Sequence, residues 1–502
     1  MKGHVHRVIG RAIGILSAVA AVGCGPQESQ KPPPATLAIT QVTLIDGTGN
    51  PARNDVTVLV DGDRIVAVGL SQDLVPDEKL PTIDGRGRFL IPGLWDSHVH
   101  LAFDAKADIE PSRQLALYLA HGVVGVRDMG SDRERILALR QRIAAGEIPG
   151  PEIVSSGPFV DGPQEAQPAV LPVADADAAR QAVRSLRAMG VDFVKVQAKL
   201  SKPAYLAVID EAQAVGLPVH GHVPDALTAA EVSNAGQRTI EHVSPALPSD
   251  AALLFNCSSR EVELRQELAE IQAARGSADP AELAERNRAL QLDLVESYSE
   301  AKAEALFGAL KQNGTRVVPT LVWSRAFSPP AEDWPEDLPR HLLPPEARQR
   351  WEGIYERFFG NATADRLALN QQVAAGSSAL VGALHRAGVR VLAGTDSLFG
   401  FVLPGFALHQ ELELLVAAGL SPAEALSAAT RGPAELLGVL DERGTVEVGK
   451  IADMVLLEAD PLADIRNTRR IVAVVDGGQV RSRADLDRML GDPDADNEAK
   501  TP

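Results

Sequence analysis

Alternating hydrophobic and polar positions, rich in Val, Ile and Leu, occur at both ends of the chain. Four such runs are present, at residues 37–49, 55–69, 444–460 and 471–482. Alternation with β-branched residues, broken by Asp-Gly pairs, predicts strands joined in hairpins. We expect these strands to form one small β-sandwich composed of residues 37–92 and 440–485.

Between these ends, short apolar segments alternate with helical patterns. Eight strand segments are predicted, at residues 93–100, 122–130, 151–157, 191–197, 217–223, 237–243, 315–323 and 389–397. Strands alternating with helices indicate βα units and a parallel sheet. Eight such units predict an α/β protein with a TIM-like (β/α)8 barrel over residues 93–439. Its active site is expected at the carboxyl ends of the strands.

Three segments depart from this alternation. Residues 258–312 carry long, charged helical patterns with heptad-like apolar spacing, which predict an inserted helical hairpin or a coiled pair. Residues 328–348 are rich in proline, and an irregular loop of that length in a compact domain favours a partial lid. The acidic end, residues 486–502, is expected to be disordered.

The N-terminus has the pattern of an export signal. Positive charges precede a short apolar stretch, and Cys24 follows small residues, as in a bacterial lipobox, although Ala21 stands where Leu is usual. We expect residues 1–23 to be a signal peptide, Cys24 to carry lipid, and residues 24–36 to form a tether. The chain would then be exported, periplasmic and attached to the membrane only through that lipid. Ordinary secretion with cleavage nearby is the alternative.

Composition excludes some classes of function. The formal charge of −18 argues against nucleic acid as a partner, because phosphate binding needs clustered Lys and Arg. Outside the N-terminus no apolar run is long enough to span a membrane. Cys257 is the only cysteine besides Cys24, which leaves no disulfide framework, and we expect it to be a buried small hydrophobe. The oligomeric state stays open.

Residues that bind metals stand at the ends of the predicted barrel strands. In "IPGLWDSHVHL", His98 and His100 are two positions apart and therefore project from the same face of a strand. Other strands end in His220 and His222 in "VHGH", His242 in "IEHV" and Asp396 in "AGTDS", and Lys195 lies inside the apolar "DFVKVQ". Each residue alone also fits a structural role, such as a helix N-cap for Asp396. Their convergence on one barrel face predicts a metal site.

The same motifs, together with "GVVGVRDMG" and "LSPAEALSAATRGPAELLGV…GTVEVGKIADMVLLEADPL", resemble the amidohydrolase superfamily, in particular its imidazolonepropionase-like and Xaa-Pro dipeptidase-like branch. The resemblance covers roughly residues 37–480. The helical insert and the Pro-rich loop have no counterpart in it. The segment around Ser155 and Ser156 lacks the Gly-x-Ser-x-Gly elbow of serine hydrolases.

The resemblance implies two divalent metal ions, most often zinc. His98, His100 and Asp396 would hold the more buried ion, and His220 and His242 the other. Lys195 would bridge them as a carbamate formed with CO2. At the fifth strand we favour His220 as the ligand, because the family ligand directly follows the apolar strand, and we expect His222 to face the substrate.

The implied reaction is attack on a carbonyl by a hydroxide that bridges the metals. Asp396 would take the proton of the attacking water and pass it to the leaving nitrogen. The second metal, with His222, would polarise the carbonyl oxygen. Trp323, Arg325 and His409 lie near loops that could contact substrate, although a structural role is the simpler reading for each.

The leading hypothesis is an exported, metal-dependent hydrolase of small amides, such as dipeptides or N-acyl amino acids. The same site could hydrolyse a lactone, a cyclic amide or a phosphotriester, since fold and ligands do not select among these bonds. A lipid-anchored binding protein without catalysis is a third possibility, opposed by the complete set of ligands. Export disfavours imidazolonepropionate hydrolysis, which is cytoplasmic in the relatives that the chain resembles.

Overall fold

The structure is a computed structural model. It describes residues 33–103, 109–164, 167–245, 247–274, 276–326, 338–360, 362–397 and 401–491. The predicted signal peptide, Cys24 and most of the tether lie outside these ranges, as do residues 328–337 of the Pro-rich segment. Among the described helices, none combines the length and the apolar character needed to cross a bilayer.

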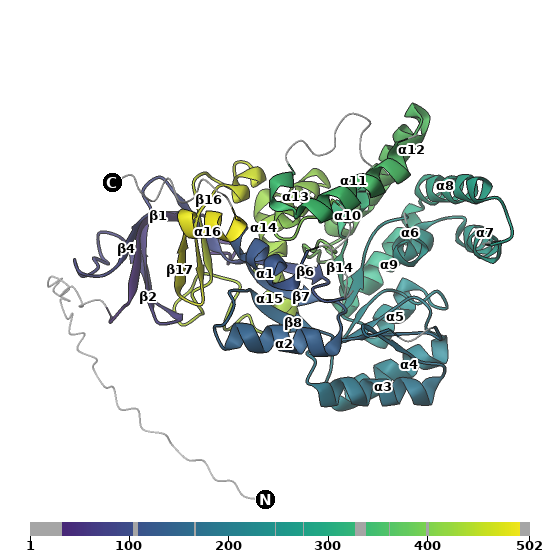
Figure 1. Ribbon diagram of the computed structural model, residues 1–502, viewed down its shortest axis with the longest axis horizontal. Coiled ribbons are helices and arrows are strands. Elements are labelled where there is room, and N and C mark those ends of the chain that lie inside the picture. The colour runs from purple at the N-terminus through teal and green to yellow at the C-terminus, as the bar shows by residue number, and fades with distance from the viewer. Residues whose placement is uncertain are drawn as a thin grey trace, which may run out of the picture.

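Strands from both ends of the chain form one hydrogen-bonded sheet (Figure 1). The strands are β1 (Leu37–Leu44), β2 (Arg53–Asp61), β3 (Arg64–Leu70), β4 (Thr82–Asp84), β5 (Phe89–Pro92), β15 (Met454–Leu457), β16 (Ile471–Asp476) and β17 (Gln479–Ser482). Their order is β17-β16-β15-β5-β1-β2-β3, with β4 beside β1. The two halves join where β5 pairs antiparallel with β15, for example at Ile91 and Val455.

This sheet has an apolar core of its own, made from both ends of the chain. Ile39 and Val58 from the N-terminal part and Met454 and Val475 from the C-terminal part belong to the same cluster. Beyond its edge, β3 exchanges backbone hydrogen bonds with the segment before β15, through Ile65. The predicted sandwich is thus a single continuous sheet that folds back on itself over this core.

Parallel strands make up the rest of the β-structure. One group has the order β6-β7-β8 and the other β10-β9-β11-β12-β13-β14. The strands are β6 (Leu94–Val99), β7 (Val123–Asp128), β8 (Glu152–Ser155), β9 (Phe159–Asp161), β10 (Val170–Pro172), β11 (Val194–Val196), β12 (Val219–Gly221), β13 (Thr239–Glu241) and β14 (Arg316–Val318).

Backbone contacts link the edges of these two groups. The amide of Asp192 donates to the carbonyl of Ser155, which connects β8 to the segment that leads into β11. On the other side, Val391 bridges in parallel to Val317 of β14, and the amide of Asp396 donates to the carbonyl of His98 beside β6. The segment 391–397 therefore lies between β14 and β6, as the eighth predicted strand should.

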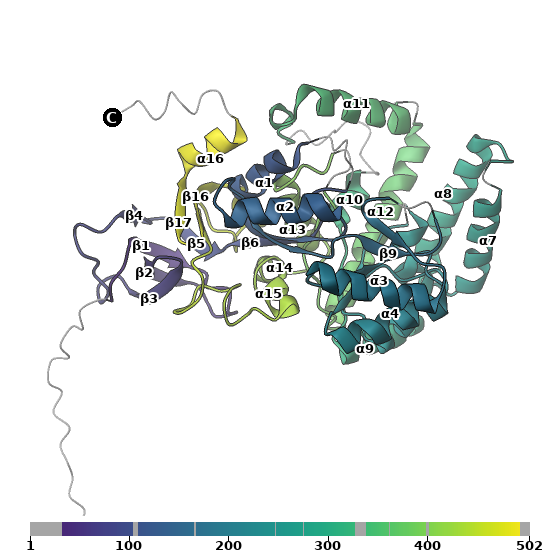
Figure 2. The same ribbon diagram turned by 60° about the horizontal axis from the view of Figure 1, so that its bottom comes forward.

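Helices cover the outside of the parallel strands (Figure 2). They are α1 (Pro111–Ala120), α2 (Arg133–Ala144), α3 (Ala176–Met189), α4 (Lys202–Val215), α5 (Ala229–Ala235), α6 (Ala252–Cys257), α9 (Glu300–Asn313), α10 (Leu321–Ala326), α12 (Ala364–Arg386), α13 (Phe406–Ala417), α14 (Pro422–Ala428) and α15 (Arg431–Leu437). Their ends follow local chemistry. Asp175 caps α3 through its side chain, and Gly190 ends it in the left-handed conformation that glycine adopts without cost.

The charged insert contains a helical hairpin. α7 (Glu261–Ala273) and α8 (Pro280–Glu296) pack together over a small core that includes Leu264, Ile271, Leu290 and Leu294. In Figure 1 the hairpin lies at the opposite end of the molecule from the β17-to-β3 sheet. α9, which the predicted insert also included, packs instead against α5 and α6 with the other outer helices.

Part of the Pro-rich segment and part of the predicted tail are ordered structure. Leu338, Leu342 and Leu343 pack with Trp351 of α11 (Pro345–Phe359), which follows the short 3-10 turn Arg340–Leu342. At the C-terminus, α16 (Arg483–Leu490) buries Leu486 and packs on α1. The tail predicted from residue 486 therefore begins too early, because the apolar spacing of "LDRML" continues a helix; residues 492–502 lie outside the described chain.

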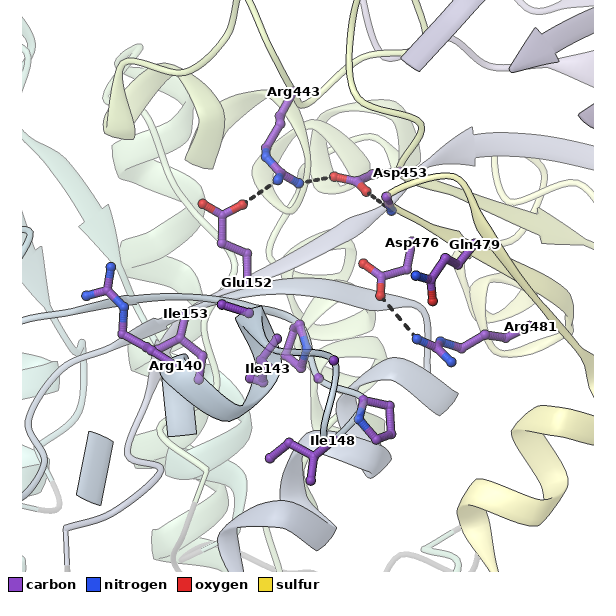
Figure 3. A pocket seen from close by; sticks show the side chains of 16 residues that line it. Arg140, Ile143, Ile148, Glu152, Ile153, Arg443, Asp453, Asp476, Gln479 and Arg481 are labelled. Carbon is purple, nitrogen blue, oxygen red and sulfur yellow. Dashed lines mark hydrogen bonds and ion pairs between the residues drawn. The ribbon is translucent and has the colours of Figure 1, made fainter. Parts of the chain in front are cut away.

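A pocket of about 680 Å³ opens where the parallel strands meet the β17-to-β3 sheet (Figure 3). Arg443 lies between two carboxylates in it, donating to Glu152 at the start of β8 over 2.7 Å and to Asp453 before β15. Arg481 pairs with Asp476 at 3.5 Å on the same wall. Each of these charges has a partner, so the pocket serves as a joint between the two parts of the chain.

Candidate metal centre

The first parallel strand presents two histidines at its carboxyl end. His98 is fully buried, and His100, just beyond β6, keeps a partly exposed edge. Beneath them, the Asp96 carboxylate accepts bonds from the amides of His98 and Thr395 and from the Thr395 hydroxyl. Asp96 therefore fixes the register between β6 and segment 391–397, which carries Asp396.

Three imidazole rings are anchored through their Nδ1 atoms. Nδ1 of His98 lies 2.9 Å from a Glu241 oxygen, that of His100 lies 2.9 Å from the Gly130 carbonyl, and that of His242 lies 2.8 Å from the Thr320 hydroxyl. A ring held in this way directs Nε2 to the opposite side, as in most protein metal sites. Each Nε2 is therefore the nitrogen available for a metal.

Asp396 faces two of these rings. Its Oδ1 lies 3.5 Å from Nε2 of His98 and 3.3 Å from Nε2 of His100. His98, His242 and Asp396 form one group whose ligand atoms all lie within 4.8 Å of one another. Both His242 and Asp396 have positive φ, a backbone region that costs energy for residues other than glycine and that recurs at functional sites.

At the fifth strand the structure separates the two candidate histidines. Nδ1 of His220 lies 3.0 Å from the Thr239 hydroxyl and 3.1 Å from Arg127, below the carboxyl ends of the strands. The ring of His222 instead lies 4.8 Å from that of His242, centroid to centroid. His222, His242 and Asp250 form a second group with metal-ligand spacing. The geometry therefore favours His222 over His220, the reverse of the sequence expectation.

Lys195 is fully buried in β11, directly beside His220 in the parallel register. Its Nζ has no hydrogen-bond partner among the described residues. Burial lowers the pKa of the Lys195 amine to about 8. A buried amine whose pKa lies near neutrality is suited to reaction with CO2.

Charge states in the site suit a metal. Burial lowers the pKa of His98 to about 4, and burial also holds the pKa values of His222 and His242 well below the usual range, so all three rings are neutral at pH 7. Burial alone would raise the pKa of Asp396, but His98, His100 and His242 lower it below its usual range. Neutral imidazoles and an ionised carboxylate are the forms that ligate metals.

The floor of the site contains an ion pair that sequence reasoning missed. Arg127 of β7 donates to both oxygens of Glu241 at 2.9 Å, and Glu241 also holds Nδ1 of His98. The pair is shielded from solvent. The available signal was a charged residue in each of two apolar strands, since buried Arg and Glu are rare unless paired. Asp250, in the 3-10 turn after β13, was also missed.

The structure places the three suggested substrate contacts on helices α10 and α13. Trp323 of α10 packs in a cluster with Val322, Val402 and Ala407. Arg325 is exposed on the same helix. His409 is fully buried in α13, where its ring nitrogens bond to the Thr468 hydroxyl and the His121 carbonyl. Its packing makes His409 a structural residue of the helical layer.

Two bacterial enzymes resemble parts of the chain. N-acyl-D-aspartate deacylase of Alcaligenes xylosoxydans xylosoxydans is 46% identical over 69 residues, which are 14% of this chain and 13% of that protein. Imidazolonepropionase of Paenarthrobacter aurescens is 31% identical over 130 residues, 24% of this chain and 31% of that protein. The matches thus span less than a third of either enzyme.

Solved structures match over nearly the whole chain. A candidate prolidase from Bifidobacterium longum is 26% identical, with a TM-score of 0.61, covering 91% of this chain and 99% of that one. A Xaa-Pro dipeptidase with bound methionine is 19% identical, with a TM-score of 0.62, covering 89% of this chain and 99% of that one. A bottromycin amidohydrolase is 22% identical, with a TM-score of 0.69, covering 92% of this chain and 90% of that one. The latter two likenesses show the fold alone: a TIM-like barrel with a β-rich domain.

A family model matches most of the chain. It is the model of the Amidohydrolase family, and it covers residues 89–317 and 341–481. Those residues include Lys195 and every histidine and aspartate of the two metal-capable groups. The chain belongs to the amidohydrolase family, and imidazolonepropionase-like and prolidase-like proteins are among its neighbours.

Proposed function

We propose that the protein is a metal-dependent hydrolase of small amides, with dipeptides and N-acyl amino acids as its substrates. The observation that carries this proposal is the convergence of buried, neutral imidazoles and the ionised Asp396 on one face, in a chain of the amidohydrolase family. The names of the deacylase and dipeptidase relatives support the choice of bond.

The residues fit two divalent ions, most simply zinc. His98, His100 and Asp396 would hold one ion, and His222 and His242 the other, with Lys195 as a bridging carbamate between them. The fit rests on the buried Nε2 of His98, Nδ1 of His222 and Nζ of Lys195, which have no hydrogen-bond partner among the described residues. We propose His222 in the place first given to His220, because His222 belongs to a group with metal-ligand spacing and its Nδ1 is buried without a hydrogen-bond partner among the described residues.

When bound, such ions lower the pKa of water and polarise a carbonyl group. The protein then has to hold and move one proton. Asp396 is placed for this, since its carboxylate is ionised and its side chain is partly exposed beside the buried His98. Asp396 accepts the proton of the attacking water and delivers it to the leaving nitrogen. Arg127 and Glu241 keep the His98 ring in a single orientation.

We further propose that the strand linkages through Ser155, Val317 and His98 close the parallel strands into the eight-stranded barrel of the family. Export and a lipid anchor at Cys24 on the periplasmic side remain proposals from the sequence pattern of residues 1–24. Labelling of expressed protein with a radioactive fatty acid tests the anchor: label is expected on the wild type and not on Cys24→Ala.

The test of function is hydrolysis of a panel of dipeptides and N-acyl amino acids by the purified chain, with metal content measured in parallel. Turnover should be lost on removal of metal by a chelator and restored by Zn²⁺ with bicarbonate. Two metals without amide turnover would move the assignment to lactones, cyclic amides or phosphotriesters. A folded protein that binds no metal would contradict the mechanism and favour a non-catalytic binding protein.

A further inference from the structure

Asp250 is a buried carboxylate that the reaction described above does not use. It ends the 3-10 turn Pro248–Asp250, which follows β13, and only 4% of its surface is exposed. Its Oδ1 accepts one hydrogen bond, from the hydroxyl of the neighbouring Ser249 at 2.8 Å. Within the described chain its one partner at ion-pair distance is His222. The Asp250 carboxyl group therefore lacks the full set of hydrogen-bond partners that a buried polar group usually has.

The position of Asp250 relative to His222 is that of a fellow ligand. Oδ1 of Asp250 lies 3.7 Å from Nδ1 of His222, which is too far for a hydrogen bond. Two ligand atoms on one tetrahedral zinc, each bonded at about 2.1 Å, lie roughly 3.4 Å apart. Nδ1 of His222 is buried and has no hydrogen-bond partner among the described residues. The two atoms therefore face the same space without bonding to each other.

We propose that Asp250 is a third protein ligand, beside His222 and His242, for the second divalent metal ion. The three ligand atoms lie within 4.8 Å of one another. Two imidazoles and one carboxylate form a donor set that zinc accepts in catalytic sites. This inference rests on the proposed function, because it assumes that the site holds metal.

The extra ligand changes what holds the second ion. With Asp250, three protein atoms bind it independently of Lys195, so it stays bound when Lys195 carries no CO2. The anionic oxygen also lowers the net charge of the ion and its ligands. A site of this kind should therefore hold its second zinc at low bicarbonate.

The experiment is a zinc titration of the full chain against a competing chelator, with Asp250→Asn compared to the wild type. Asp225→Asn is the matched control, since Asp225 is an exposed aspartate three residues after His222 and belongs to neither metal-capable group. We expect Asp250→Asn to bind the second zinc at least tenfold more weakly, with the first unchanged, and the control to match the wild type. The visible spectrum of the second Co²⁺ equivalent should change only in the Asp250 variant.

Unchanged affinity and an unchanged Co²⁺ spectrum in folded Asp250→Asn would overturn the proposal, as would equal loss of both ions. Asp250→Glu gives a second reading that does not depend on the asparagine variant folding. Because this variant keeps the carboxylate, we expect it to retain part of the affinity for the second ion. If it retains none of that affinity, the result counts against a ligand role for Asp250. If the wild type itself binds no zinc, the proposed function fails; if it binds two and hydrolyses amides, only the role of Asp250 is at stake.

Discussion

Buried polar groups at the two ends of the parallel strands differ in whether they have partners. At the carboxyl ends, Nε2 of His98, Nζ of Lys195 and Nδ1 of His222 are buried without hydrogen-bond partners among the described residues. At the start of β8, Arg443 is held by Glu152 and Asp453 (Figure 3). Unpartnered buried polar atoms are expensive and persist where a ligand completes them. The carboxyl ends are thus where a ligand is expected, and the Arg443 cluster joins two parts of the fold.

The sharpest test of this contrast is Asp396→Asn. The amide keeps the size of the side chain but can no longer take up a proton, and it is a poorer metal ligand. We expect a loss of kcat/KM of about a thousandfold or more on the best amide substrate, with little change in the thermal midpoint. If the variant retains a tenth of wild-type turnover, Asp396 does not have the proposed role in proton transfer.

Neutralising Glu241 should damage both stability and metal binding. In Glu241→Gln the buried Arg127 loses its anion, which should lower the free energy of unfolding by about 3–5 kcal/mol in urea denaturation. His98 also loses its charged partner, and metal affinity should fall by about ten- to a hundredfold.

Glu411→Gln is the matched control for that experiment. Glu411 is also fully buried but accepts only the amides of Leu321 and Val322, and burial raises its pKa to about 8. It is therefore already neutral at pH 7, and the amide should be tolerated. Equal losses in the two variants would show that burial, and not the ion pair, sets the cost.

At the joint, stability and activity should separate. Arg443→Met leaves Glu152 and Asp453 without their cation, and we expect the free energy of unfolding to fall by about 1–3 kcal/mol. kcat/KM should stay within twofold, because the joint lies away from the carboxyl ends of the strands. The exposed pair of Arg466 with Asp464 is the control, and Arg466→Met should have almost no effect. A large loss of activity in Arg443→Met would show that the Arg443 cluster and the metal-ligand cluster are energetically coupled.

The most gradual expected effect is a pH dependence at the same joint. Burial, and then the neighbouring Asp453, raise the pKa of Asp476 to about 6 from an ordinary 3.8. Between these values the folded state holds a proton that the unfolded state has released, so stability falls as pH rises from about 4 to 6. The contribution over this whole range is at most about 3 kcal/mol, or no more than about 1.4 kcal/mol for each pH unit. Asp476→Asn should flatten the plot of unfolding free energy against pH between about 4 and 6. An unaltered slope would show that Asp476 is not the group that titrates there.

The sequence predicted well those features that follow from strand periodicity. Apolar runs that end in His98, His242 and Asp396 predicted that these residues lie on one face, and the structure brings them together. Periodicity cannot separate His220 from His222, because residues two apart share a face. Their positions along the strand separate them, because the Thr239 hydroxyl and Arg127 bond to His220 and not to His222.

Residues outside regular elements were the hardest to predict. Asp250 lies in a short turn after β13, with no periodic pattern to mark it. His409 was suggested as a substrate contact because it lies near a predicted loop, yet its ring is directed toward Thr468 and His121. Helix rotation depends on packing that the linear pattern does not record.

The pairing of β5 with β15 has a consequence in time. Ile91 and Val455 are neighbours in the sheet, yet about 360 residues separate them along the chain. At synthesis rates of about 5–20 residues per second, the first strands wait roughly twenty seconds to a minute for their partners. Through that interval β5 has an open, apolar edge of the kind that pairs with other chains. The nascent chain is therefore most prone to aggregate before β15 is synthesised, and a chaperone that covers that edge would raise the yield of folded protein.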